Sequence, residues 1–203
     1  MTNHTKLLIG FDLDGVVLDT TPAIIHLHHE TTGEIPRIHH SQTKMWNFED
    51  IITATNEEIN NYFASERLFE IMTFISDGKL SMKTLIEELL VSELFEVYCI
   101  TKGTPKNIYL KRQWLKERLP LFNLDNLIGV PMEMDGKPNV NTTIFIDDFS
   151  KNFNGNAKYN ILFRKNGLVT DYNSDESTSH YQVGSVVELA NKIFELIDFE
   201  RRI

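Results

Sequence analysis

Several features that would mark other classes of protein are scarce or missing in this chain of 203 residues. Its one cysteine, Cys99, allows no internal disulfide and predicts a reducing, cytoplasmic environment. No apolar run approaches the ~20 residues that span a bilayer, and Asp12 and Asp14 cut off the short apolar stretch near the start, so we expect no membrane segment or signal peptide. The formal net charge of −9 opposes binding to duplex nucleic acid or anionic membranes.

Three common site patterns are also missing from the sequence. No G-x-G-x-x-G follows the first apolar run, no G-x-x-x-x-G-K-[ST] is present, and no G-x-S-x-G occurs, which argues against a dinucleotide site, an NTPase P-loop and a serine hydrolase. The chain has no internal repeat. Its 41% hydrophobic and 24% charged residues, and its length, fit one globular domain with a small insertion.

Short apolar runs alternate with amphipathic segments along most of the chain. The runs predict buried strands at residues 6–11, 95–100, 127–130, 143–146 and 159–163. Apolar residues at i, i+3 and i+4 predict helices at residues 82–94 and 186–199. A further helix is expected at residues 107–119, and Pro120 marks its end. This alternation predicts an α/β fold: a Rossmann-like parallel sheet with helices on both faces. The polar residues 171–180 are expected to form an exposed loop.

Residues 20–76 interrupt the alternation. They contain no convincing buried strand, but they include helical segments at 22–31 and 56–63 joined by polar loops. We therefore predict a small helical cap inserted after the first strand. The α/β core would then comprise residues 1–19 and 77–203.

Residues that can carry chemistry follow three of the predicted strands. They are Asp12 and Asp14 after the first strand, Thr101, Lys102 and Gly103 after the second, and Asp147 and Asp148 after the third. The carboxyl ends of parallel strands meet at one edge of a sheet, where ligands bind, so these residues are expected to share one cleft. Converging carboxylates need a cation, and Mg²⁺ prefers carboxylate oxygens together with a substrate phosphate. A lysine and a hydroxyl opposite the metal would bind phosphoryl oxygens, which favours phosphoryl transfer.

The ordered motifs resemble those of the haloacid dehalogenase (HAD) superfamily. F-D-L-D-G-V-V-L-D-T, at residues 11–20, resembles its first motif, hhhDxDGx; I-T, at 100–101, resembles its second, and I-F-I-D-D, at 144–148, its fourth. A narrower similarity is to the 5'(3')-deoxyribonucleotidase family (5' nucleotidase C type). It is carried by K-R-Q-W-L-K-E-R-L-P at 111–120, T-K-M-W at 43–46 and I-D-D-F-S-K-N at 146–152.

The resemblance implies a Mg²⁺-dependent phosphomonoesterase. Asp12 would be the nucleophile and form an aspartyl-phosphate, and Asp14 would protonate the leaving oxygen and then activate water. The carboxylates of Asp12 and Asp148 and the backbone carbonyl of Asp14 would bind Mg²⁺, with Asp147 binding it directly or through water. Thr101 would donate its hydroxyl to the phosphoryl group.

The sequence offers three candidates for the lysine of the third motif. Lys111 with Trp114 fits the K-x-x-W helix that supplies this lysine in the nucleotidase family. Lys137, in G-K-P, is the alternative because many HAD enzymes carry a lysine-proline motif, but it leaves no space for a helix before the next strand. Lys106 is a third candidate, and we rank Lys111 first.

The expected partner is a small phosphorylated substrate, in particular a nucleoside or deoxynucleoside 5'-monophosphate. Lys102, Gly103, Trp46 and Phe48 are predicted to contact it, the two aromatic residues by stacking. Another phosphate ester, such as a sugar phosphate, remains an alternative. So does a non-enzymatic phosphate-binding or signalling protein, although receiver domains place their acidic pair first and their nucleophile later. The apolar faces of the cap leave a homodimer open.

Overall fold

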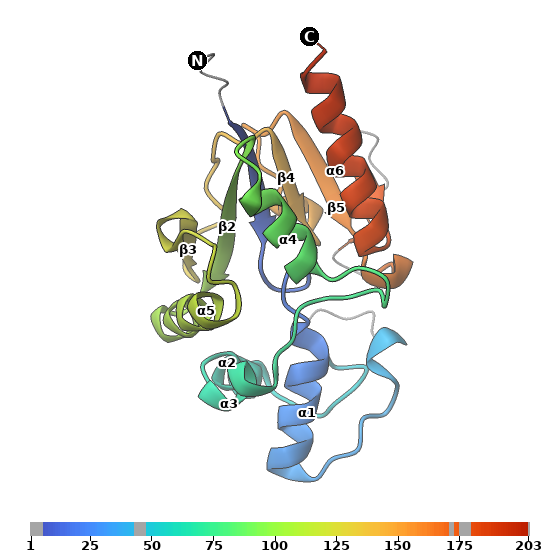
Figure 1. Ribbon diagram of the computed structural model, residues 1–203. Coiled ribbons are helices and arrows are strands. Elements are labelled where there is room, and N and C mark those ends of the chain that lie inside the picture. Colours follow the sequence, from blue (N-terminus) through green and yellow to red (C-terminus); the bar gives the residue numbers. More distant parts are fainter. Residues whose placement is uncertain (1–5, 43–47, 171–172, 175–179, 203) are drawn as a thin grey trace.

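The computed structural model describes residues 6–42, 48–170, 173–174 and 180–202. Within these residues six parallel strands form one sheet in the order β3-β2-β1-β4-β5-β6 (Figure 1). The strands are β1 (Leu7–Asp12), β2 (Phe95–Gly103), β3 (Leu127–Pro131), β4 (Ile144–Asp147), β5 (Tyr159–Phe163) and β6 (Tyr181–Val183). The five predicted strands are present, and the α/β fold class is confirmed. The sequence did not predict β6, which has three residues, two of them exposed.

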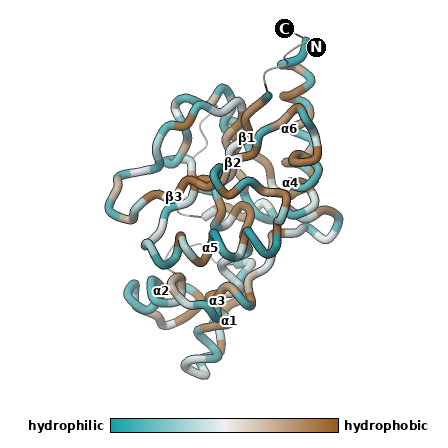
Figure 2. Tube along the Cα trace, turned by 60° about the vertical axis from the view of Figure 1, so that its left-hand side comes forward, coloured by the Kyte–Doolittle hydropathy of each residue, from teal (hydrophilic) through white to brown (hydrophobic). Residues whose placement is uncertain are grey.

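Three helices outside residues 20–76 lie at positions close to those predicted. They are α4 (Met82–Val91), α5 (Pro105–Arg118) and α6 (Val186–Glu200). Each begins at a hydroxyl side chain that accepts a hydrogen bond from the first turn: Ser81, Thr104 and Ser185. Figure 2 shows hydrophobic residues along the strands at the centre and both hydrophilic and hydrophobic residues along α5. The buried residues of α5 are likewise of both kinds: Asn107, Leu110, Lys111, Trp114 and Leu115.

The two faces of the sheet are covered differently. Side chains on one face, such as Phe11 and Cys99, belong to the large core cluster that also contains apolar residues of α4, α5 and α6. On the other face, Ile100, Val130 and Phe145 form a smaller cluster. Partly buried residues from loops near the short 3-10 helix η3 (Ser150–Asn152) pack against it. One face therefore carries most of the core.

A group of helices lies between β1 and β2 in the chain and below the sheet in Figure 1. It contains α1 (Thr20–Thr32), the 3-10 helix η1 (His40–Gln42), α2 (Asn56–Phe63) and α3 (Glu66–Ile71), and α1 contacts both α2 and α3. The two predicted segments are helical here, whereas α3, only six residues long, was not predicted. We call residues 20–76 the cap; its extent as a separate domain stays a prediction.

Two chain segments connect the cap to the sheet and pair with each other. Leu18 forms an antiparallel bridge with Phe74, the Asp19 amide donates to the Thr73 carbonyl at 2.9 Å, and the Ile75 amide donates to the Val17 carbonyl at 3.0 Å. Paired backbone on both connections fixes where the cap meets the carboxyl ends of the strands.

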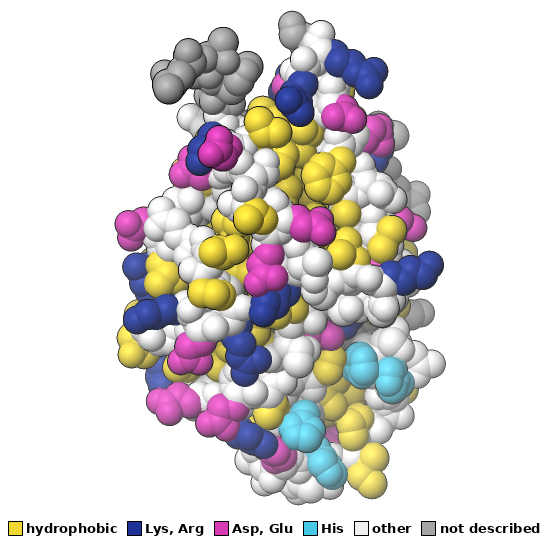
Figure 3. Space-filling model, viewed as in Figure 1, with side chains coloured by type: hydrophobic (Ala, Val, Ile, Leu, Met, Phe, Trp, Pro, Cys, Tyr) yellow, Lys and Arg dark blue, Asp and Glu magenta, His cyan; other side chains and the backbone are white. Residues whose placement is uncertain are grey.

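The face that carries α4 and α6 exposes hydrophobic side chains (Figure 3). Val91 at the end of α4 and Phe194 and Phe199 of α6 are among the exposed apolar residues. A homodimer remains a prediction. In the described part of the chain, no helix combines the length and the apolar character needed to cross a membrane.

Candidate active site

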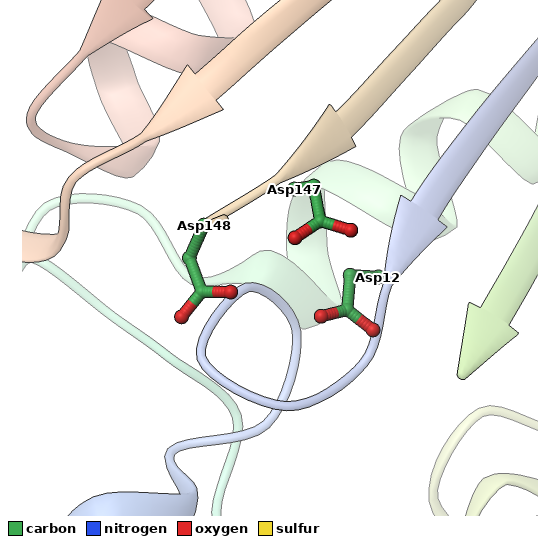
Figure 4. Close-up of side chains that lie close together, drawn as sticks. All are labelled: Asp12, Asp147 and Asp148. Carbon is green, nitrogen blue, oxygen red and sulfur yellow. The ribbon is translucent and has the colours of Figure 1, made fainter. Parts of the chain in front are cut away.

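Three aspartates meet at the carboxyl ends of two neighbouring strands. Asp12 ends β1, Asp147 ends β4 and Asp148 follows it. Phe11 pairs with Ile146 across these parallel strands, so the register places Asp12 level with Asp147. One carboxylate oxygen from each aspartate lies within 4.8 Å of the others (Figure 4). All three side chains are buried, so their negative charges act on one another with little screening by water.

The Lys137 side chain lies between two of these aspartates. Its Nζ is 2.7 Å from Asp12 Oδ1 and 2.7 Å from Asp147 Oδ2, and the side chain is 3% exposed. Burial raises the pKa of Asp12 to about 7, and Lys137 opposes this shift. Burial also raises the pKa of Asp148, and the nearby Asp147 and Asp12 raise it further. One lysine cannot neutralise three carboxylates, so the cluster fits an additional hard cation with oxygen ligands.

A second lysine holds the other aspartate of the first motif. Lys111, two turns into α5, donates to Asp14 Oδ2, to Thr101 Oγ1 at 2.7 Å and to the Lys102 carbonyl at 3.4 Å. Its side chain is buried, while that of Asp14 is 22% exposed. Because α5 begins directly after β2, its second turn lies over the end of that strand, which carries Thr101. Trp114 lies three residues further along α5 and is also buried.

Gly15 allows the chain after β1 to pass against Asp148. Its φ is +76°, in the left-handed region that glycine adopts without strain. A Cβ at this position would lie 2.2 Å from Asp148 Oδ2. The absence of a side chain at Gly15 therefore leaves the Asp148 carboxylate free to face the other aspartates.

A cavity of about 680 Å³ lies between the strand ends and the cap. Asp12, Lys137 and Asp148 are among the residues that line it, and the cap contributes apolar groups from Phe48, Ile59 and Phe63, among others. The volume falls within the range of small-molecule sites. The cavity thus brings an anion-binding end and an apolar wall to one space.

The comparisons with known proteins identify the family. The sequence model of the family "5' nucleotidase, deoxy (Pyrimidine), cytosolic type C protein" matches residues 6–187. The chain belongs to this nucleotidase family. This confirms the resemblance and makes the protein a HAD-type phosphatase, a phosphoric monoester hydrolase that acts on a small phosphorylated substrate.

Solved structures similar to this nucleotidase family member are HAD hydrolases. A haloacid dehalogenase-like hydrolase from Streptococcus pneumoniae has a TM-score of 0.58 and 15% identity, over 93% of this chain and 98% of that one. A HAD-superfamily subfamily IA hydrolase from Geobacter sulfurreducens has a TM-score of 0.54 and 14% identity, over 96% and 97%. A hydrolase from Pseudomonas syringae has a TM-score of 0.52 and 16% identity, over 94% and 99%. At such identities they support the fold alone. No curated protein sequence matches the chain.

The structure brings most of the predicted catalytic residues of this nucleotidase family member together. Asp12, Asp147 and Asp148 form one cluster, and Asp14, Thr101 and Lys111 form the second. The sequence ranked Lys111 before Lys137, but both lysines reach the site: Lys111 contacts Asp14, and Lys137 contacts Asp12. Lys137 comes from a loop after β3, so no intervening helix is needed. Lys106 is exposed and does not line the cavity.

The predicted substrate-binding residues have different outcomes. Lys102, Gly103 and Phe48 line the cavity. Phe48 is buried and has a φ of +63°, a strained value for a bulky residue. Trp46 lies outside the described residues. The roles of these residues in binding stay predictions.

The cavity wall also contains residues that the sequence did not assign to the site, among them four with polar side chains. They are Asp19 and Thr20 at the start of α1, Asn107 in the first turn of α5, and Lys165 after β5. Asp19 and Thr20 continue the first motif, and Lys165 follows a predicted strand by two residues, so their positions near strand ends were the available signal.

Proposed function

We propose that this protein is a Mg²⁺-dependent 5'-nucleotidase that hydrolyses nucleoside or deoxynucleoside 5'-monophosphates through an aspartyl-phosphate on Asp12. The observation that carries the proposal is the buried cluster of Asp12, Asp147 and Asp148, with Lys137 inserted, at one end of a cavity that fits a small organic phosphate. Membership in the nucleotidase family supports the substrate class.

Asp12 is oriented for attack on phosphorus. Its Oδ1 accepts hydrogen bonds from the Leu13 amide at 2.7 Å and from Lys137 at 2.7 Å. Two donors on one oxygen fix the plane of the carboxylate, which reduces the entropy lost in reaching the transition state. The lysine also offsets the negative charge that an approaching phosphate would meet.

Asp14 is placed to act as acid and base. Its Oδ1 accepts from the Thr20 hydroxyl at 3.1 Å, and its Oδ2 accepts from Lys111. Asp14 would protonate the leaving oxygen of the ester and then take a proton from the water that hydrolyses the aspartyl-phosphate. Lys111 and Thr101 both donate to the Asp14 carboxylate. When substrate binds, they would give up part of these hydrogen bonds and donate to the phosphoryl oxygens instead.

The donor set fits Mg²⁺. The carboxylates of Asp12 and Asp148 and the backbone carbonyl of Asp14 would hold the ion, with Asp147 bound directly or through water. The cluster is buried, and this burial, together with the neighbouring carboxylates, raises the pKa of Asp12 and of Asp148; a divalent ion would offset the cost of keeping these carboxylates charged. Bound there, the ion would supply positive charge to the phosphoryl oxygens.

The remaining walls of the cavity suit a nucleoside. The apolar groups of Phe48, Ile59 and Phe63 can pack on a base. Lys102 and Gly103 line the cavity at the end of β2, just before the N-terminus of α5, where a phosphate would be favoured. A sugar phosphate remains the alternative substrate. A cytoplasmic location is proposed on the single buried cysteine and the family description.

Release of inorganic phosphate tests the proposal. The panel contains nucleoside 5'- and 3'-monophosphates, sugar phosphates and p-nitrophenyl phosphate, each with and without Mg²⁺. We expect the 5'-monophosphates to be the best substrates and Asp12→Asn to lower kcat/KM by about 10³-fold or more. Asp125→Asn is the matched control, because that side chain is 89% exposed. Equal rates for Asp12→Asn and the parent would exclude Asp12 as the nucleophile. If a sugar phosphate is hydrolysed with a higher kcat/KM than every nucleotide, the substrate is a sugar phosphate and not a nucleotide.

A further inference from the structure

A charged pair lies on the wall of the substrate cavity and takes no part in the steps above. Lys165 Nζ is 2.5 Å from Asp19 Oδ1, although the two residues are 146 positions apart in the chain. The side chains are 26% and 21% exposed, and both line the cavity. Asp19 is the last core residue before the cap, and Lys165 follows β5, so the pair joins two distant core segments at the cavity wall.

Asp19 stands at a position where its side chain would ordinarily serve the helix. It is the N-cap residue of α1, and aspartate at an N-cap usually accepts a hydrogen bond from the first turn. The Asp19 side chain makes no such bond. Its carboxylate is directed to Lys165 instead, so helix capping does not account for an aspartate here.

Lys165 begins the short 3-10 helix η4 (Lys165–Gly167), and hydrogen bonds connect the chain around it to Asn173. Arg164 Nε and Nη2 donate to the Asn173 carbonyl at 3.0 and 2.7 Å. The Asn173 side chain accepts from the Thr170 amide at 2.7 Å and donates to the Leu168 carbonyl at 3.1 Å. Asn173 is 3% exposed. These hydrogen bonds connect the residues after β5 to the buried Asn173, which also lines the cavity.

The residue next to Lys165 has a left-handed backbone conformation. Asn166 has a φ of +56°, and among the described residues only Phe48 is a second non-glycine residue with positive φ. Both line the cavity. Such positions concentrate at ligand sites, because the surrounding structure must hold them. Asparagine adopts this conformation at little cost, so the turn at Asn166 supports a wall shaped for a ligand only together with the ion pair.

The chemistry of the pair favours a group that both donates and accepts hydrogen bonds. Asp19 and Lys165 are neutral together, so a second phosphate would have to displace the lysine and face a carboxylate. An apolar group would displace the water that solvates the two charges and would offer no hydrogen bonds in its place, which costs free energy. A hydroxyl can donate to the carboxylate and accept from the ammonium while the pair stays intact.

The neighbours of the pair also suit a hydroxyl. His40 lines the cavity close to both charges, and burial lowers its pKa, with His39 and Lys165 lowering it further. A neutral imidazole can donate or accept a hydrogen bond. The cavity then offers an anion-binding end, an apolar wall and a hydroxyl-binding wall, which correspond to the phosphate, base and sugar of a nucleotide.

We propose that Asp19 and Lys165 determine substrate specificity by binding a hydroxyl of the sugar in the leaving group. The inference rests on the proposed nucleotidase function and deepens it. A substrate without that hydroxyl would displace water from the charged pair without replacing its hydrogen bonds, which costs binding in the transition state.

Matched nucleotides test the inference. The ribo-, 2'-deoxyribo- and 2',3'-dideoxyribonucleoside 5'-monophosphates of one base are compared by kcat/KM in the parent, Asp19→Asn and Lys165→Met. We expect removal of one hydroxyl to lower kcat/KM of the parent by roughly 10-fold to 100-fold. In both variants the ratio between the hydroxylated and dideoxy substrates should fall toward one. Lys158→Met is the control, since Lys158 pairs with Glu200 at 2.7 Å before the start of β5.

The outcomes separate the inference from the proposed function. If the parent hydrolyses p-nitrophenyl phosphate but no nucleotide, the nucleotidase function is wrong and the inference falls with it. If the parent hydrolyses nucleotides but the three sugars give one rate, or if the ratio in both variants equals that of the parent, the inference alone is wrong. A uniform loss on every substrate, p-nitrophenyl phosphate included, would show a structural role for the pair and also overturn it.

Discussion

Replacement of Lys137 by methionine tests whether Lys137, and not Lys111, offsets the charge of the proposed nucleophile Asp12. The change keeps a long side chain but removes the ammonium that lies 2.7 Å from both Asp12 and Asp147. Breaking a buried ion pair by removing one partner costs about 3–5 kcal/mol of unfolding free energy, because a charge is left buried without compensation. We expect a loss of this size for metal-free Lys137→Met at pH 8, measured by urea unfolding.

The pH dependence follows from the sign of the shift at Asp12. Its pKa is raised to about 7 in the folded protein, from 3.8 for an ordinary aspartate. The folded state therefore binds the proton more tightly than the unfolded chain, and stability falls as pH rises from about 4 through 7. Without Lys137 the pKa rises further, so the penalty should be smaller at pH 5.5 than at pH 8, and Mg²⁺ should recover part of it.

Lys111→Met is the matched comparison. Lys111 pairs with Asp14, whose side chain is 22% exposed, so solvent screens the remaining charge and the stability loss should be smaller. Both variants should lower kcat/KM. If Lys137→Met is as stable as the parent at both pH values, or retains full activity while Lys111→Met does not, our assignment of Lys137 to the nucleophile is refuted.

Three further predictions concern other parts of the protein. Gly15→Ala should lower kcat/KM by about 10²-fold, because a Cβ there would displace the Asp148 carboxylate; an unchanged rate would contradict this. Removal of divalent ions should abolish phosphate release, and Mg²⁺ should raise Tm more at pH 8 than at pH 5.5, since protons on Asp12 compete with the ion; a pH-independent shift would argue against the cluster as its site. Thr55→Ala should lower stability by about 1 kcal/mol in chemical unfolding, through loss of the capping box at α2, with little change in activity.

The sequence alone determined the fold class and the position of the carboxylates. Apolar runs with polar residues at their ends identify buried parallel strands, and the carboxyl ends of such strands must meet at one edge. Asp12, Asp147 and Thr101 could therefore be assigned to one site before any coordinates were known. Strand β6 and helix α3 were missed, because elements of three and six residues are too short to show a period.

Only the tertiary structure decided which loop residues enter the site. Lys137 and Lys165 lie on loops, where side-chain direction depends on the path of the chain and not on a periodic pattern. Residues 171–180 were expected to be exposed, yet Asn173 is buried. Its side-chain amide bonds the backbone of Leu168 and Thr170, and a polar sequence does not reveal which of its side chains will make such buried bonds. Strand ends follow from local sequence, whereas contacts between residues over a hundred positions apart require the packed fold.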